Sequence, residues 1–303
     1  MSVIERALEK ARLRGAKPIA IARPGTAPTS ELATELAVSR TVSRGTPTRR
    51  VSVNVERLRA QGMIPPADSQ RRLAAQMRVI KFRLLQAAVS TGSARDRVVM
   101  ITSALSGDGK TFNCISLALS LATERDFHIL LVDGDMPKPN LGQFFGVEGS
   151  SGLLDLARDP SLDPEQLIIG TDLPGLDLLP AGQCGVDAAE ILSSNGMRNT
   201  IERLVAVPDR IVLLDSPPLL QTSESAVLSQ HAGQVVMVVR DSVTPQRAVQ
   251  DALASLGDRK GLNLLLNGVS DSKLEEYYYG YGQYGSYGEQ EAESISVQEV
   301  VGG

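Results

Sequence analysis

Tryptophan is absent from this 303-residue chain, and cysteine and histidine occur only twice each. Cys114 and Cys184 lack the spacing of a metal site or of a disulfide framework, so we expect both to be small buried side chains in a reducing compartment. No apolar run approaches the roughly 18–20 residues that a membrane-spanning helix needs, and the beginning of the chain lacks the apolar core of an export signal. These absences predict a cytoplasmic protein and leave a membrane-bound partner possible.

Tyrosine is also missing from most of the chain. A core would scatter its tyrosines wherever a hydroxyl finds a partner. Here they alternate with glycines just before an acidic end, where no packed core can form, which predicts that something is meant to reach their hydroxyls. All six lie in one 11-residue stretch: Tyr277, Tyr278, Tyr279, Tyr281, Tyr284 and Tyr287.

The net charge of −4 hides an uneven distribution. Residues 1–66 contain 12 Lys/Arg and 5 Asp/Glu, giving +7, whereas residues 271–303 contain one lysine and 7 acidic residues, giving −6. A basic arm and an acidic tail can attract each other or meet different partners. The basic residues of the arm are spread through Pro, Thr and Ser without aromatic residues between them, so we do not expect a nucleic-acid partner.

Changes in composition divide the chain into four parts. Residues 1–15 begin with a capping box and predict a short helix. Residues 16–68 are rich in Pro, Thr, Ser and Arg and predict a largely disordered linker. We expect residues 69–272 to form the folded domain, beginning with an amphipathic helix over 69–89. Residues 273–303 form an acidic tail rich in tyrosine and glycine.

Short apolar runs alternate with helical stretches in the expected domain. Several runs are almost continuous Val, Ile and Leu, which is typical of strands covered on both faces. The alternation predicts an α/β fold with a mostly parallel, doubly wound sheet of the P-loop NTPase type. The expected strands are 98–102, 129–132, 176–179, 211–214, 235–239 and 262–269.

The first expected strand runs into a phosphate-binding loop, Ala104–Thr111, with alanine in the first glycine position. Gly107 and Gly109 let backbone N–H groups converge on phosphate oxygens, and the following helix adds its positive end. We expect Lys110 to contact the outer phosphates and the Thr111 hydroxyl to bind Mg²⁺. The candidate nucleotide-binding residues are Ser106, Gly107, Asp108, Gly109, Lys110 and Thr111.

Polar residues follow later strands at the sheet edge where ligands bind. After the second strand, one of Asp133 and Asp135 can support a metal while the other accepts a hydroxyl proton. Helix capping is the alternative role for this pair. Asp215 ends a further strand and is expected to support Mg²⁺. Asn267 ends the last strand, where its amide can read an adenine edge or bond to the loop backbone.

With these residues in view, the chain resembles the bacterial tyrosine kinases of exopolysaccharide systems, and among them the exosortase-associated tyrosine autokinases. The marks of the resemblance are the loop 104–111, Asp133-Gly134-Asp135, Asp215-Ser216-Pro217-Pro218, the segments 178–182 and 190–193, the opening helix and the tyrosine-glycine tail. The chain departs from the family at Pro137, where arginine is usual and Lys138 comes next. Ala75, Arg78 and Lys81 stand in the places of a self-association motif of one glutamate and two arginines.

The resemblance implies an ATP-dependent protein-tyrosine autokinase whose acceptors are the tail tyrosines. It implies that Thr111, Asp135 and Asp215 support Mg²⁺, that Lys110 holds phosphate, and that Asp133 takes the proton of the incoming tyrosine. It also implies assembly with other copies of the chain, and a membrane-bound activator of the chain-length-determinant type that recruits the protein to the inner face of the cell membrane. A tyrosine phosphatase would reverse the reaction, and the cycle would regulate exopolysaccharide biosynthesis and export.

Two other readings remain open at this point. A nucleotide-switched positioning or partitioning ATPase would share the sheet and the three motifs, but its loop carries an extra lysine five residues before the main one, where this chain has Leu105. A non-enzymatic scaffold with an adhesive Tyr/Gly-rich tail is the second alternative. The adhesive reading predicts that tail function survives Tyr→Phe substitution, whereas the kinase reading predicts its loss.

Overall fold

The computed structural model describes residues 45–185, 187–259 and 261–270. The expected opening helix, 1–15, and the tyrosine tail, 273–303, lie outside this part of the chain. The strands are β1 (Arg49–Val51), β2 (Val98–Ser103), β3 (His128–Asp133), β4 (Ile169–Thr171), β5 (Leu176–Leu179), β6 (Arg210–Asp215), β7 (Gln234–Arg240) and β8 (Leu262–Asn267). The helices are α2 (Val55–Ala60), α3 (Ala67–Ser90), the 3₁₀ helix η2 (Ala94–Arg97), α4 (Lys110–Leu121), α5 (Leu141–Phe145), α6 (Leu153–Arg158), α7 (Pro164–Leu167), α8 (Ala188–Leu192), α9 (Asn195–Val205), α10 (Ser223–Ser229) and α11 (Gln246–Ser255).

The described strands form one sheet in the order β1-β4-β5-β3-β6-β2-β7-β8. Every neighbouring pair is parallel except β4 and β5, which are antiparallel. The mostly parallel, doubly wound α/β sheet predicted from the sequence is therefore confirmed, and each of the six expected strands is present. The sequence pattern did not reveal β1 and β4, because three residues are too few to show a period of two.

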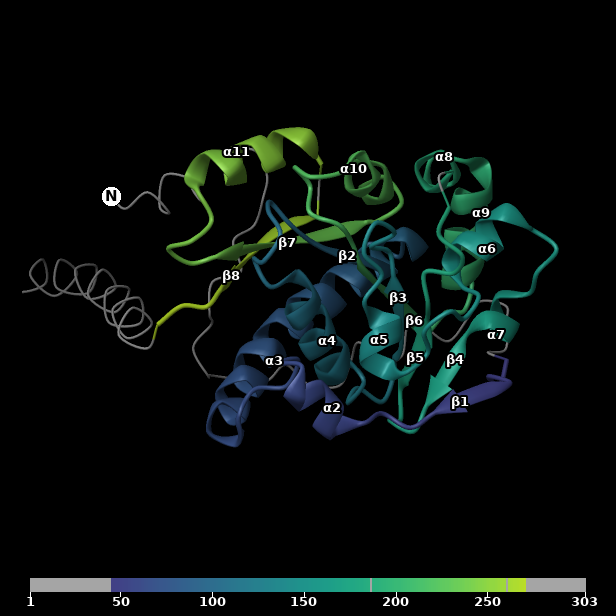
Figure 1. Ribbon diagram of the computed structural model, residues 1–303, viewed down its shortest axis with the longest axis horizontal. Coiled ribbons are helices and arrows are strands. Elements are labelled where there is room, and N and C mark those ends of the chain that lie inside the picture. Colours follow the sequence, from purple (N-terminus) through teal and green to yellow (C-terminus); the bar gives the residue numbers. More distant parts are fainter. Residues whose placement is uncertain (1–44, 186, 260, 271–303) are drawn as a thin grey trace, which may run out of the picture.

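Side chains of the central strands alternate between two apolar layers. In β2, Val99 and Ile101 face the layer shared with α3 and α4, while Val98 and Met100 face the layer shared with α6 and α9. Helices cover the sheet from both sides, with α3 and α4 on one face and α6, α9, α10 and α11 on the other (Figure 1). Burial on both faces explains why these strands are almost uninterrupted apolar runs.

Residues 45–68, the described part of the expected linker, are folded, so the prediction of a disordered linker was wrong there. β1 adds a parallel strand to β4. The Asp172 carboxylate accepts a hydrogen bond from the Val53 backbone at 2.9 Å. In α2, which Asn54 caps, Leu58 is fully buried. The polar composition concealed these contacts, because their partners lie about a hundred residues further along the chain.

Helix α3 matches the helix expected over 69–89, and its apolar stripe packs on α4. Lys81, which stands in the place of a self-association arginine, is used within the chain. Its Nζ donates to the carbonyl of Ser120 at 3.0 Å and pairs with Glu124 at 2.6 Å, at the end of α4. This lysine therefore ties α3 to α4.

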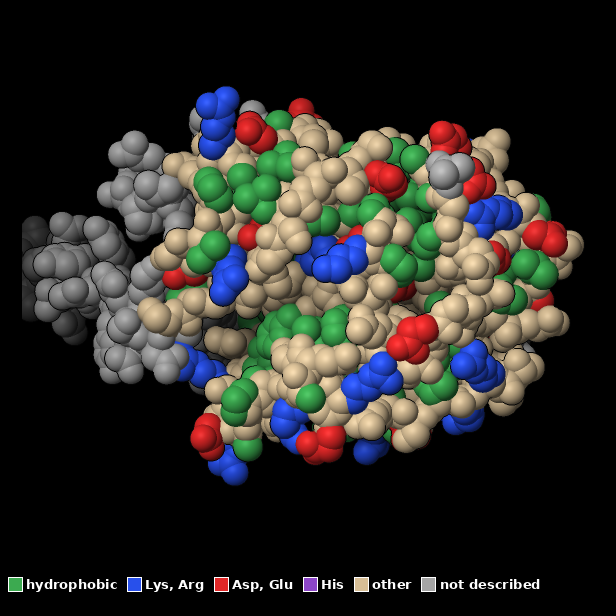
Figure 2. Space-filling view, viewed as in Figure 1, with side chains coloured by type: hydrophobic (Ala, Val, Ile, Leu, Met, Phe, Trp, Pro, Cys, Tyr) green, Lys and Arg blue, Asp and Glu red, His purple; other side chains and the backbone are tan. Residues whose placement is uncertain are grey.

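Charge is mixed on the face shown in Figure 2, where acidic and basic side chains are interspersed. Among the described helices, none is both long and apolar enough to cross a membrane. The feature that positions the site is the shared direction of the central strands. Because β5, β3, β6, β2, β7 and β8 are parallel, the loops that follow them meet at one edge of the sheet.

Candidate active site

The loop between β2 and α4 has a backbone that only glycine adopts readily. Gly107 and Gly109 have φ angles of 88° and 98°, in the left-handed region. A Cβ at Gly109 would also lie 2.1 Å from the side-chain nitrogen of Asn267. Helix α4 starts directly afterwards at Lys110, so the unpaired N–H groups and positive dipole end of a 12-residue helix face the loop. This arrangement can bind phosphate oxygens.

Asp108 stabilises the phosphate loop through hydrogen bonds from inside and outside the loop. Its side chain is buried, and Oδ2 accepts a hydrogen bond from the Leu105 backbone at 3.1 Å. The other carboxylate oxygen accepts from the Thr244 hydroxyl at 2.7 Å, and the Asp108 carbonyl accepts from the Asn267 amide at 2.9 Å. Asn267 therefore bonds to the loop backbone, which is one of the two roles expected for it.

Two residues that support the phosphate loop, Thr244 and Arg240, were not predicted from the sequence. Thr244 reaches Asp108 as described, and the Arg240 guanidinium donates to the carbonyl of Gly107 at 3.4 Å. Both belong to the end of β7 and the turn that follows. The rule that singled out the aspartates, a polar residue at the carboxyl end of a buried parallel strand, also applies to Arg240.

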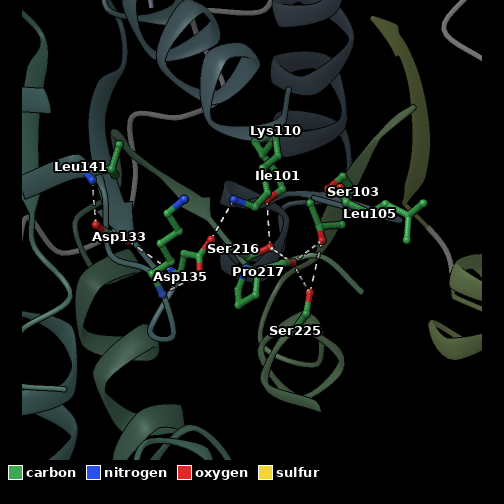
Figure 3. Close-up of polar contacts among 12 residues, drawn as sticks. Ile101, Ser103, Leu105, Lys110, Asp133, Asp135, Leu141, Ser216, Pro217 and Ser225 are labelled. Carbon is green, nitrogen blue, oxygen red and sulfur yellow. Dashed lines mark hydrogen bonds and ion pairs between the residues drawn. The ribbon is translucent and has the colours of Figure 1, made fainter. Parts of the chain in front are cut away.

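The carboxylates of Asp133 and Asp215 are brought together by strand register, since these residues are partners in the β3–β6 ladder. Asp133 accepts hydrogen bonds from the backbone of Asp135 at 3.2 Å and of Leu141 at 2.9 Å (Figure 3). Burial, followed by the neighbouring charge of Asp215, raises the pKa of Asp133 to about 7. A carboxylate with this pKa can accept a proton near neutral pH.

Asp215 is fully buried, and its Oδ1 has no hydrogen-bond partner among the residues that the structure describes. Burial raises the pKa of Asp215 to about 6, against the opposing charge of Lys110 and a hydrogen bond from the Thr111 hydroxyl. A buried carboxylate oxygen without a partner costs free energy unless a cation or donor meets it. Asp215 therefore has an oxygen available for a ligand.

Lys110 provides the positive charge of the site. Its Nζ lies 2.8 Å from Asp135 Oδ2. Burial alone would lower the pKa of Lys110, but the charges of Asp215, Asp135 and Asp133 outweigh burial and raise it. The lysine stays protonated and can pair with phosphate oxygens.

The segment after β6 is fixed against β2 by hydroxyl groups. Ser216 Oγ donates to the carbonyl of Ile101 at 2.9 Å. Thr102 and Ser225 each donate to the carbonyl of Pro217 at 2.8 Å. Figure 3 shows Ser216, Pro217 and Ser225 together. These bonds hold the Asp215-Ser216-Pro217 turn beside the phosphate loop, so the Asp215 carboxylate has little freedom to move.

The donors at this edge suit Mg²⁺, a cation that prefers oxygen ligands and octahedral geometry. Thr111, Asp135 and Asp215 supply a hydroxyl and two carboxylates, and the orphaned Asp215 oxygen is a free ligand position. Within the described ranges, no group of three His, Cys, Asp or Glu side chains could hold a metal ion unaided. In Mg²⁺ sites, water and substrate phosphates usually complete the coordination shell.

The structure thus brings the phosphate loop, Lys110, the three aspartates and Asn267 to one edge of the sheet. The six tail tyrosines lie outside the described residues. Cys114 is buried as expected, but the same expectation was wrong for Cys184, which is exposed. It lies in the turn after β5, where no packed element covers it.

The chain has relatives among curated proteins, although no protein-family model matches it. It is 32% identical over 185 residues to the tyrosine-protein kinase YwqD of Bacillus subtilis. The match covers 60% of this chain and 77% of that protein. It is 35% identical over 196 residues to the putative tyrosine-protein kinase EpsB of Ralstonia nicotianae, covering 63% of this chain and 25% of EpsB. The chain thus spans about a quarter of the EpsB length.

Solved structures agree with these relatives. The VpsO kinase domain is 30% identical, with a TM-score of 0.52, and the match covers 64% of this chain and 98% of that domain. The kinase domain of the Escherichia coli tyrosine kinase ETK has a TM-score of 0.60 at 24% identity, covering 87% of this chain and 96% of that domain. The second likeness supports the fold.

Proposed function

Because this chain belongs to the bacterial tyrosine-protein kinases, we propose that it is an ATP-dependent autokinase that phosphorylates the tyrosine cluster of its own C-terminal tail. The observation that carries the proposal is the set of charges at the sheet edge. Lys110 and three aspartates converge beside a phosphate loop, and one of them, Asp133, has a pKa of about 7. A phosphate-binding site beside a potential proton acceptor suits phosphoryl transfer.

The proposed reaction is a single displacement at the γ-phosphorus of ATP. The tyrosine hydroxyl oxygen bonds to the γ-phosphorus of ATP, the bond to the β–γ bridging oxygen breaks, and ADP leaves with that electron pair. The phenolic proton passes to the Asp133 carboxylate. Lys110 and the start of α4 hold the outer phosphate oxygens in place.

Thr111, Asp135 and Asp215 would hold Mg²⁺. When bound, the metal neutralises phosphate charge and orients the transferring group. The nucleotide-binding set is completed by the loop residues Ser106, Gly107, Asp108 and Gly109. Asn267 is assigned a supporting role, because its amide already donates to the Asp108 carbonyl.

The cellular part of the proposal rests on the resemblance of the motifs. Copies of the chain assemble with one another, and a membrane-bound protein of the chain-length-determinant type activates the kinase at the inner face of the cell membrane. A tyrosine phosphatase returns the tail to its starting state. The cycle regulates exopolysaccharide biosynthesis and export.

The test is intact-mass analysis with tail peptide mapping after incubation with Mg·ATP, with and without the cytosolic tail of a candidate membrane activator. We expect phosphate on residues of the Tyr277–Tyr287 stretch and none in Lys110→Met. A variant with all six tyrosines changed to Phe is the control for the acceptor sites. ATP turnover without tail phosphate, even with the activator, would instead indicate a positioning ATPase.

A further inference from the structure

The sheet order gives Asp133 two different neighbours. On one side lies β6 with Asp215, and beyond it β2 leads into the phosphate loop. On the other side lies β5, paired to β3 through Val132 and Leu179. The chain leaves β5 as residues 180–185, here called the 180–185 segment, so this segment starts at the edge where Asp133 ends its strand.

The beginning of the 180–185 segment is fixed to helix α6. The backbone N–H groups of Leu153 and Leu154 donate to the carbonyls of Pro180 and Ala181, both at 2.9 Å. A Cβ at Gly152 would lie 1.9 Å from the Pro180 carbonyl oxygen, so this close approach requires glycine. The helix start therefore acts as a rigid support for the segment.

Two charged side chains of α6, Asp155 and Arg158, fix the backbone of Gln183 further along the segment. Asp155 Oδ2 accepts hydrogen bonds from the backbone of Gly152 at 2.9 Å and of Gln183 at 3.2 Å. Arg158 Nη1 donates to the carbonyl of Gln183 at 2.5 Å, and Nη2 donates to Asp187 at 2.9 Å. The Gln183 backbone is thus held on both its N–H and its C=O.

The outer part of the segment is exposed and ends in two small residues, Cys184 and Gly185. Pro180 and Ala181 are buried, whereas Gln183, Cys184 and Gly185 are exposed. The Cys184 thiol also lies within electrostatic reach of the site: the residue is exposed, but partial burial of its thiol and then the negative charge of Asp133 raise the pKa of Cys184. Cys184 and Gly185 are small, and the segment begins one residue after the Val132–Leu179 pair, so its exposed end leaves room for an aromatic ring near the sheet edge where Asp133 ends its strand.

We propose that the 180–185 segment is the wall along which the acceptor tyrosine reaches Asp133, and that Arg158 is the positioning residue that holds this wall. This inference rests on the proposed kinase function. In an in-line transfer the attacking oxygen comes from the side opposite the leaving ADP. ADP leaves toward the phosphate loop on the β2 side, so the acceptor arrives from the β5 side, where the segment lies.

Cys184 makes the wall directly testable in the full chain, because the other cysteine, Cys114, is fully buried. The folded protein is modified with methyl methanethiosulfonate, which adds a small group, or with N-benzylmaleimide, which adds a bulky one. Intact mass confirms one adduct. We then measure the rate of tail phosphorylation and the affinity for a fluorescent ATP analogue, with Cys184→Ser treated in parallel and compared with its own untreated sample.

We expect the bulky adduct to slow tail phosphorylation by at least about tenfold, which corresponds to about 1.4 kcal/mol, and the small adduct to slow it less. The affinity for the nucleotide should change less than about twofold. Treated Cys184→Ser should keep its own rate. The proposed role of the 180–185 segment would be contradicted if a complete bulky adduct left the rate unchanged. It would also be contradicted if the adduct weakened nucleotide binding by the same factor as it slowed phosphorylation. Absence of tail phosphate in the unmodified chain would instead refute the kinase function.

Substitution of Arg158 provides the second measurement. Arg158→Gln should lower kcat for tail phosphorylation about tenfold with KM for ATP unchanged, and Arg158→Lys should restore part of it, because the lost interaction serves the acceptor rather than the nucleotide. Arg203→Gln is the matched control: Arg203 also holds loop carbonyls, those of Pro160 and Leu162, but not the 180–185 segment. Equal losses of kcat in the two Gln variants would contradict the role of Arg158.

Discussion

Asp133 and Asp215 illustrate how two ordinary aspartates become a reactive pair at the scale of single residues. Each ends a buried strand, and the β3–β6 register places them side by side. Burial raises both pKa values, to about 7 for Asp133 and about 6 for Asp215. Both Asp133 oxygens accept hydrogen bonds from backbone N–H groups, while one Asp215 oxygen has no partner in the described part of the chain. The same environment thus suits the roles proposed for them, Asp133 as proton acceptor and Asp215 as cation ligand.

The first prediction concerns the pH dependence of tail phosphorylation. The proposed base is Asp133 in its deprotonated form, so the rate should rise with pH and level off above an apparent pKa of about 7. Measured at limiting nucleotide, the profile reports the free protein. Asp133→Asn should lower the rate by at least about 100-fold and abolish this profile.

Asp126→Asn serves as the control for that substitution, because Asp126 is exposed and precedes β3 at the opposite end of the strand. Its rate and pH profile should equal those of the unchanged chain. A rate that is independent of pH between about 5 and 8, spanning the expected pKa, would exclude Asp133 as the base.

The second prediction concerns stability. Folding raises the pKa of Asp133 from about 4 to about 7, so the folded state binds this proton more tightly than the unfolded chain. The free energy of unfolding therefore falls as the pH rises through this window. Asp133→Asn has no such titration, so its stability relative to the unchanged chain should increase by about 1–3 kcal/mol between pH 5 and pH 8.

Urea unfolding of both proteins at the two pH values measures this difference, with Asp126→Asn as the reference for an exposed carboxylate. A difference in the free energy of unfolding that stays constant between the two pH values would mean that Asp133 titrates normally.

At the scale of secondary-structure elements, the phosphate loop depends on strands other than its own. β8 supplies Asn267, which donates to the Asp108 carbonyl, and the turn after β7 supplies Thr244, which donates to the Asp108 carboxylate. The residues after β8, including the tyrosine cluster, therefore continue from a strand that is bonded to the nucleotide loop. The conformation of the phosphate loop is therefore linked to β8 through the hydrogen bond between Asn267 and Asp108.

The third prediction tests that link. Asn267→Ala removes one hydrogen bond from a glycine-containing loop, worth about 0.5–1.5 kcal/mol, so the affinity for an ATP analogue should fall about three- to tenfold. Asn263→Ala is the matched control on the same strand, because the Asn263 amide donates to the carbonyl of Gly261 rather than to the phosphate loop within the described ranges. Fluorescence titration measures both, and equal affinities would show that the loop holds its shape without Asn267.

At the scale of the whole molecule, charge separation is the main feature of the chain. Residues 1–66 carry +7 and residues 271–303 carry −6, while the described residues, which begin at Gly45, show mixed charge on the face seen in Figure 2. Each tyrosine phosphate adds about −1.5 to −2. Full phosphorylation would therefore make the tail far more acidic than the arm is basic.

The fourth prediction follows from this imbalance. Like charges brought together in an assembly repel one another, so phosphorylation of the tail should shift the chain toward smaller species. Light scattering at low ionic strength compares the phosphorylated chain, the unphosphorylated chain and a variant with all six tyrosines changed to Phe. The Phe variant should behave as the unphosphorylated chain does before and after ATP, and an unchanged mass after phosphorylation would contradict the repulsion.

Much of the site could be predicted because it follows from local rules. Apolar runs identified six of the strands, and the three acidic residues lie at or just after the ends of two of them, β3 and β6. Glycines at 107 and 109 indicated the loop, and both have the positive φ that the loop needs. β1 and the burial of Leu58 were missed, because their partners are distant in the chain.

The sequence by itself determined the α/β class, the phosphate loop and the acidic strand ends, because periodicity and glycine placement are local properties of a chain. Only the tertiary structure decided which loops meet. Register placed Asp133 against Asp215. Thr244 after β7 and Asn267 of β8 donate hydrogen bonds to Asp108, and Arg158 holds the Gln183 backbone of the 180–185 segment. Such contacts depend on the order of strands in the sheet, which no local pattern encodes.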